Sequence, residues 1–198
     1  MLRLVLATRN QHKAAELKYF LRGLKVELLT LRDFPDSIRL VEDGTTFTEN
    51  ALKKARTVYR HTGILSLADD SGLEVFYLVG RPGVYSARYA GQGATDEDNN
   101  TKLLNEMRGV PPRRRKTQFR CVLALVGDGI EEVEEGTCQG RLAEFPRGTN
   151  GFGYDPIFLP DGFDRTYAEL TEDEKNRISH RSRAFGKMRE ILQSRFGV

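Results

Sequence analysis

The sequence contains no tryptophan, only two cysteines and only three histidines among its 198 residues. Cys121 and Cys138 cannot build a disulfide framework, and their spacing matches no zinc-site pattern. No apolar run approaches the ~20 residues of a membrane-spanning helix. The apolar stretch at residues 2–8 is short, and the polar and basic residues after it form no cleavage pattern, so we interpret it as a strand and not as a signal peptide. These absences favour a globular, cytoplasmic protein without a membrane partner.

The sequence also lacks a strong charge of either sign. Its formal net charge is +3, and its isoelectric point near 8.9 is mildly basic. This balance suits an anionic ligand but does not by itself indicate nucleic acid. The basic run Arg113–Lys116 follows two prolines, and no aromatic residues interleave with it as they would in a stacking platform. We interpret it as a solvated connection between a helix and a strand, with a nucleic-acid-binding module as the alternative from another functional class.

What is present is an alternation of apolar runs with amphipathic segments, which predicts an α/β protein. A chain of this length can build one substantial core or two small lobes. The expected strands span residues 3–8, 25–30, 64–68, 73–78, 117–126 and 130–138, with a hairpin turn at residues 128–129. The expected helices begin at caps Asn10, Thr48 and Thr95 and end near Gly23, Gly63 and Met107, and a last helix covers residues 184–192. A loop through Pro35 and Asp36 separates the second strand from the second helix.

Two adjacent carboxylates, Asp69 and Asp70, follow the apolar run at residues 64–68. Placing two like charges side by side at a strand end is costly unless a cation or a bound partner offsets the repulsion. Such a pair is a candidate for a hard metal ion held by oxygen ligands. The alternative is a solvated turn, because Asp, Ser and Gly are ordinary turn residues. Glu42 and Asp43 stand outside the nearest helical pattern and supply either a further oxygen ligand or a polar loop.

The segment from Thr8 to Lys13 joins a strand to a helix. A helix start presents free backbone N–H groups to an anion, and Thr8, Asn10 and Lys13 add side-chain donors there. The glycines of a Walker loop are missing. An ordinary capped helix start explains the same residues equally well.

Two further segments carry ligand-binding residue types. Glycines at positions 148, 151 and 153 allow close approach of the backbone to a ligand, and Phe152 and Tyr154 offer stacking surface. Lys175, His180 and Arg181 surround the start of the last helix, where an anion or the polar edge of a ring fits.

Together these segments resemble one known family, the house-cleaning inosine and xanthosine triphosphate pyrophosphatases. The resemblance covers residues 4–185. In chain order, the motifs that carry it are Thr8-x-Asn10-x-x-Lys13, Glu42-x-Gly44-x-Thr46-Phe47-x-Glu49-Asn50-Ala51, Ala68-Asp69-Asp70-Ser71-Gly72-Leu73, Pro82-Gly83-Val84-Tyr85-Ser86-Ala87-Arg88-Tyr89, Gly151-Phe152-Gly153-Tyr154-Asp155-Pro156 and Glu174-Lys175-x-x-Ile178-Ser179-His180-Arg181.

The resemblance implies a cytoplasmic, homodimeric, Mg²⁺-dependent enzyme that splits dITP, ITP, dXTP or XTP into the monophosphate and pyrophosphate. It implies a single domain over residues 1–198, with an elongated mixed sheet, flanking helices and two lobes around a nucleotide-binding cleft. It assigns Glu42 and Asp70 to the metal, and Asp70 also to activation of the attacking water. The residues that it places on the substrate are Thr8, Arg9, Asn10, Gln11, His12, Lys13, Ser71, Phe152, Gly153, Tyr154, Asp155, Lys175, His180 and Arg181.

Physical chemistry agrees with these assignments. Attack at the α-phosphorus requires neutralisation of the leaving pyrophosphate, which Mg²⁺ and Lys13 supply, and a polarised water, which Asp70 orients. Donors from Lys175, His180 or Arg181 favour a 6-keto purine over adenine, because adenine offers an amino group at that position. We expect Asp69 to support Asp70 and not to bind metal, since successive strand residues point to opposite faces. A related pyrophosphatase that prefers pyrimidine or modified nucleotides is the nearer alternative.

Overall fold

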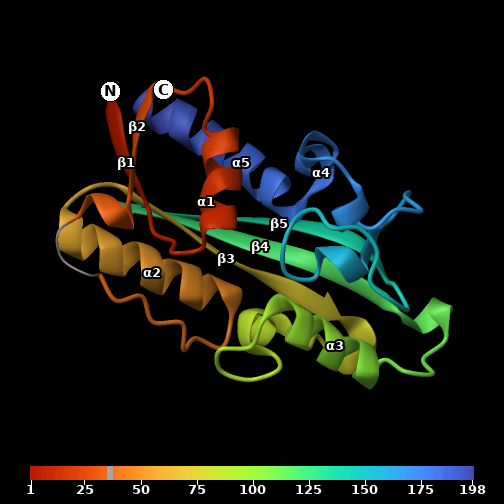
Figure 1. The fold of residues 1–198 in the computed structure, drawn as a ribbon. Helices are drawn as coiled ribbons and strands as arrows, with labels where there is room; N and C mark the ends of the chain where they lie inside the picture. The colour runs from red at the N-terminus through yellow and green to blue at the C-terminus, as the bar shows by residue number, and fades with distance from the viewer. Residues whose placement is uncertain (35–37) are drawn as a thin grey trace. The chain divides into compact units, whose positions relative to one another are not determined.

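The computed structural model describes residues 1–34 and 38–198, so the loop predicted through Pro35 and Asp36 lies outside the described residues. The fold is α/β, with a six-stranded sheet in the order β2-β1-β3-β4-β5-β6 (Figure 1). The strands are β1 (Leu2–Leu6), β2 (Val26–Thr30), β3 (Ser66–Val75), β4 (Lys116–Gly127), β5 (Ile130–Leu142) and β6 (Phe158–Pro160). The α-helices are α1 (Gln11–Phe20), α2 (Phe47–Thr62), α3 (Asp96–Glu106), α4 (Glu172–Ile178) and α5 (His180–Phe196), with short 3-10 turns between several elements.

The sheet is mixed. Strand β1 pairs in parallel with β2, where Leu2 lies opposite Val26, and in parallel with β3, where Val5 lies opposite Ser66. Strands β5 and β6 pair antiparallel. Only two residues, Asp128 and Gly129, join β4 to β5, and Gly129 has the positive φ of 63° that a tight hairpin demands. The α/β class and the mixed sheet with flanking helices are therefore confirmed.

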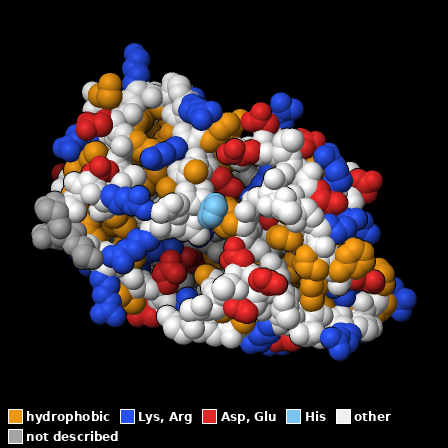
Figure 2. Space-filling model, viewed as in Figure 1, with side chains coloured by type: hydrophobic (Ala, Val, Ile, Leu, Met, Phe, Trp, Pro, Cys, Tyr) orange, Lys and Arg blue, Asp and Glu red, His pale blue; other side chains and the backbone are white. Residues whose placement is uncertain are grey.

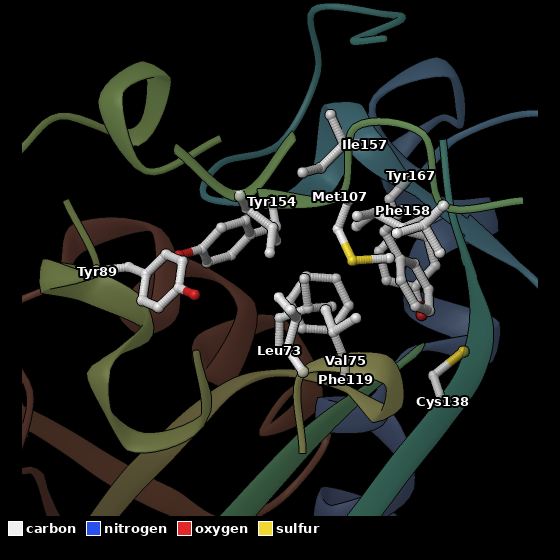
Figure 3. Close-up of a cluster of buried hydrophobic side chains, with 14 of the residues drawn as sticks. Leu73, Val75, Tyr89, Met107, Phe119, Cys138, Tyr154, Ile157, Phe158 and Tyr167 are labelled. Carbon is white, nitrogen blue, oxygen red and sulfur yellow. The ribbon is translucent and has the colours of Figure 1, made fainter. Parts of the chain in front are cut away.

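The chain forms two compact units. The first comprises residues 1–70, 121–136 and 181–198, and the second comprises residues 71–120 and 137–180. Each unit has its own buried apolar cluster. The first cluster includes Leu4, Leu6, Leu17, Leu67, Leu123, Leu125, Phe185 and Met188. The second includes Leu73, Val75, Met107, Phe119, Ile157, Phe158 and Tyr167 (Figure 3). The predicted nucleotide cleft and the assignment of residues 1–198 to a single domain stay predictions.

Strand β3 corrects two sequence-based expectations. The predicted turn at Asp69-Asp70-Ser71-Gly72 is wrong, because all four residues continue the strand. Buried apolar residues flank them on both sides, and Lys13 and Lys54 pair with the two carboxylates. The strand ends at Val75, and residues 76–78 form a 3-10 turn where the sequence predicted further strand.

Local signals elsewhere give the helix ends. Asn10 and Thr95 cap α1 and α3 as predicted. Helix α2 is capped by Thr46, two residues before the predicted Thr48. The Thr46 side chain accepts the Glu49 N–H, and the Glu49 carboxylate accepts the Thr46 N–H, so the two residues form a capping box.

The basic run at residues 113–116 is only partly solvated. Arg115 is buried, and its guanidinium donates to the carbonyl oxygens of Met107, Leu142 and Ala143 at 2.7–2.9 Å. The expectation of a wholly solvated connection is therefore wrong at this residue.

On the face drawn in Figure 2, basic and acidic side chains are interspersed. No helix within the described residues is long and apolar enough to cross a membrane.

Candidate active site

The turn between β1 and α1 is built by its own polar side chains. The Asn10 side-chain oxygen accepts the Lys13 N–H at 3.1 Å, and the Thr8 hydroxyl oxygen accepts the Asn10 N–H at 3.2 Å. Arg9 donates to the Ile38 carbonyl oxygen at 2.7 Å. Gln11 and His12 are exposed in the first turn of α1. The predicted capped helix start is confirmed, with the Lys13 N–H used by the cap. A helix start of this kind suits an anion in general.

The carboxylate of Asp69 is completely buried in the middle of β3. It pairs with the Lys13 ammonium, and its Oδ2 accepts from Arg181 Nε and from the Cys121 thiol at 3.0 Å each. Burial acts to raise the pKa of this carboxyl, but the charges of Arg181 and Lys13 hold it well below its ordinary value. Asp69 is therefore an ionised member of a buried charge cluster.

Asp70 meets a different set of partners. Its carboxylate accepts from Lys54 Nζ at 2.8 Å and from the Asn50 side-chain amide at 3.2 Å. Burial raises the pKa of Asp70 above its ordinary value, although the neighbouring Lys54 charge opposes this shift. A carboxyl with a raised pKa is a better proton acceptor at neutral pH.

Lys54 marks a site where oxygen atoms surround one cation. Its ammonium lies 2.6 Å from the Glu42 carboxylate, 2.8 Å from that of Asp70 and 2.6 Å from the Asp69 carbonyl oxygen. Two carboxylates and a carbonyl are donors that a hard divalent cation prefers, so these residues fit such an ion, with further ligands from water or substrate. The described residues contribute only two carboxylate side chains to this site. A group of three or more His, Cys, Asp or Glu side chains that could hold a metal ion is not found within residues 1–34 and 38–198.

Sequence reasoning missed Lys54, and it named Asn50 only as part of a motif, without a role. Both lie on the buried side of α2, together with Ala51, Ala55 and Val58. A lysine on an otherwise apolar helix face was the available signal, because lysine is almost never fully buried unless it is paired.

A second group of predicted residues lies in the second unit. The Asp155 carboxylate accepts from the Phe152 N–H at 2.9 Å and from Lys175 Nζ at 2.7 Å. The same ammonium lies 4.8 Å from the centre of the half-buried Phe152 ring. Gly151 is required here, since a Cβ at this position would lie 2.0 Å from Asp155 Oδ2. The structure thus brings Phe152, Asp155 and Lys175 together.

The other predicted residues of this unit are partly or wholly buried. Tyr154 is buried, with its hydroxyl donating to the Ser86 carbonyl oxygen at 2.9 Å, and burial raises its pKa. The Gly153 N–H donates to Asp96. His180 is buried and stacks on Phe119, with ring centres 4.7 Å apart. Ser71 is half-buried in β3.

Arg181, predicted as a substrate contact next to His180, is 1% exposed in the first unit. Its guanidinium pairs with the carboxylates of Asp69 and Glu16. The substrate and metal roles of all these side chains stay predictions.

Comparison with known proteins shows which family this chain resembles. Residues 4–191 match the Ham1 family. A dITP/XTP pyrophosphatase of Geobacter sulfurreducens is 50% identical over 97% of both chains, and one of Bacillus licheniformis is 47% identical over 97% of this chain and 98% of its own. The solved structure of a HAM1 protein from Coxiella burnetii has a TM-score of 0.89 at 42% identity, covering 98% of this chain and all of that one. This chain therefore belongs to the Ham1 family.

Proposed function

We propose that this protein hydrolyses non-canonical purine nucleoside triphosphates (dITP or ITP, dXTP or XTP) to the monophosphate and pyrophosphate, and so removes them from the nucleotide pool. The observation that carries the proposal is the pair of functional groups on β3, with Asp70 beside Glu42 and Lys54 and with Asp69 beside Lys13. Family relatives named dITP/XTP pyrophosphatase support it, since they match nearly the whole chain at 45–50% identity.

Mg²⁺ is the cofactor that we propose for this reaction. Glu42 and Asp70 would hold it, because their carboxylates already share one cation, the Lys54 ammonium. Bound there, Mg²⁺ would neutralise phosphate charge and polarise water.

The chain's own residues account for the remaining steps. A water oxygen bonds to the α-phosphorus, the bond to the bridging oxygen of the β-phosphate breaks, and the Asp70 carboxylate takes the proton of the water. Lys13 and the first N–H groups of α1 would bind the departing pyrophosphate. Lys175, which lies over the Phe152 ring, would donate to the 6-keto oxygen of the base.

The test is a panel of nucleoside triphosphates, with and without Mg²⁺, in which pyrophosphate and orthophosphate are measured separately. We expect ITP, dITP and XTP to be hydrolysed faster than ATP, GTP or pyrimidine triphosphates, with pyrophosphate as the product and only when Mg²⁺ is present. Asp70→Asn should lose this activity while its circular dichroism spectrum stays unchanged. Stepwise release of orthophosphate, or full turnover by Asp70→Asn, would contradict the mechanism.

We also propose that the protein acts as a cytoplasmic homodimer, as the resemblance implies. Light scattering of the purified protein tests the dimer. A monomeric mass at the concentrations of the activity assay would contradict it.

A further inference from the structure

The mechanism above gives no task to Asp69, although its carboxylate is completely buried and pairs with two cations. Lys13 comes to it from the first turn of α1, and Arg181 comes to it from the first turn of α5. Burial of a charge costs free energy, which ion pairing offsets only in part. A buried carboxylate between two cations from separate helices is therefore a candidate for a functional role.

The ion pairs continue beyond Asp69. Arg181 also pairs through Nη1 with Glu16, which lies on α1 three residues after Lys13. Residues three apart on a helix share one side of it. Helix α1 thus contributes both ends of a chain of alternating charges that runs Lys13, Asp69, Arg181, Glu16.

In this arrangement the Lys13 side chain stays partly exposed while the buried Asp69 carboxylate holds its ammonium. The Lys13 side chain is 15% exposed, whereas those of Asp69 and Arg181 are 0% and 1% exposed. A lysine side chain normally loses much rotamer freedom when it binds an anion. A lysine that a buried carboxylate already holds has lost that freedom before the anion arrives.

We propose that Asp69 is a positioning residue that aims the Lys13 ammonium at the phosphate-binding turn of residues 8–13, and that Arg181 and Glu16 fix the Asp69 carboxylate for this purpose. The inference rests on the proposed function, because it assigns Lys13 to the pyrophosphate part of the substrate. It assigns no metal contact to the Asp69 carboxylate.

The variant that tests the inference is Asp69→Asn, which keeps the shape of the side chain and removes its charge. Its matched control is Glu74→Gln on the same strand, where the carboxylate accepts from Arg120 at 3.0 Å. Binding of inorganic pyrophosphate is measured by calorimetry, and the steady-state constants for ITP are measured in parallel. We expect Asp69→Asn to weaken pyrophosphate binding about tenfold or more and to raise KM more than it lowers kcat, with Glu74→Gln unchanged.

A merely structural role is separated from positioning by a double-mutant cycle with Lys13→Met. If Asp69 acts through Lys13, then Asp69→Asn has no further effect on pyrophosphate binding once Lys13 is replaced. Equal losses in both backgrounds would overturn the inference.

If Asp69→Asn does not fold, Glu16→Gln takes its place in the same cycle, because it breaks the far end of the chain of charges. We expect a smaller loss of pyrophosphate binding in the same direction, again absent beside Lys13→Met. No loss with Glu16→Gln would overturn the inference, as would failure of the wild-type protein to bind pyrophosphate. A wild-type protein that binds pyrophosphate but does not hydrolyse ITP would overturn the proposed function alone.

Discussion

Two neighbouring aspartates have separate partners because successive side chains of a strand point to opposite faces. Asp69 contacts Lys13, Arg181 and Cys121, whereas the Asp70 carboxylate contacts Lys54 and Asn50. The two carboxyls consequently have pKa shifts of opposite direction, lowered for Asp69 and raised for Asp70. The two proposed roles, Asp69 as the anchor of Lys13 and Asp70 as the proton acceptor, are consistent with this difference.

Lys54 gives the first prediction at the scale of single residues. Lys54→Met removes the cation that Glu42 and Asp70 share, so kcat/KM should fall about 100-fold or more. The free energy of unfolding should fall by about 3–5 kcal/mol, since a buried carboxylate loses its partner. Added Mg²⁺ should raise the melting temperature of this variant more than that of the wild type, because the ion replaces the missing charge.

The neighbouring residue supplies the control for this experiment. Lys53 pairs with the exposed Asp43, and exposed ion pairs contribute only about 0–1 kcal/mol. Lys53→Met should therefore leave activity and melting temperature almost unchanged. An equal effect of Mg²⁺ on Lys54→Met and on the wild type would argue against a shared cation site.

Tyr89 gives a prediction about pH. Burial, and then the Glu106 carboxylate that its hydroxyl contacts at 2.6 Å, raise the Tyr89 pKa to about 12. Because the folded pKa lies above the unfolded value of about 10, the proton on Tyr89 stabilises the fold below pH ~10, and this contribution is lost as the pH rises through ~12. Ultraviolet titration of the wild type against Tyr89→Phe should show one tyrosine fewer ionising above pH ~11 in the variant. The same difference near pH ~10 would contradict this prediction.

At the scale of elements, the loop before β6 depends on one glycine. Gly151 has a φ of 76°, and a Cβ there would meet Asp155 Oδ2 at 2.0 Å. Gly151→Ala should therefore displace the carboxylate that holds Lys175, and KM for ITP should rise. Melting temperature should also fall, because a left-handed residue with a side chain costs about 1–2 kcal/mol.

Gly162→Ala is the matched control for the loop. Its φ is 87°, but nothing lies within 4 Å of the added Cβ. It should lose similar stability without a change in KM. A rise in KM in both variants would mean that general destabilisation, and not the Asp155 contact, explains the effect.

At the scale of the whole molecule, strands β3, β4 and β5 each run from one compact unit into the other. We expect the two units to unfold together, because no strand can lose its order in one unit without disturbing its continuation. Leu67→Ala in the first core should lower the free energy of unfolding by about 2–5 kcal/mol. Hydrogen exchange should show the same decrease at Ala68, in the first unit, and at Leu73, which belongs to the second unit. A decrease confined to the first unit would contradict a joint transition.

The parts of the fold that the sequence predicted correctly are those determined by interactions between residues close in the chain. Periodicity predicted the α/β class, and caps at Asn10 and Thr95 predicted two helix starts, because these signals involve residues a few positions apart. The turn predicted at Asp-Asp-Ser-Gly was wrong because this prediction, too, used only local composition, which is typical of a turn. Only the tertiary structure supplies the buried cations that let these residues continue a strand.

The sequence by itself determined the family, because six ordered motifs carry the same residue types at the same spacing. The tertiary structure alone decided which charges pair. Arg181 lies 112 residues from Asp69 along the chain, and Lys54 lies 16 from Asp70. No local pattern encodes such pairs, because burial by the folded core determines where a charge must find a partner.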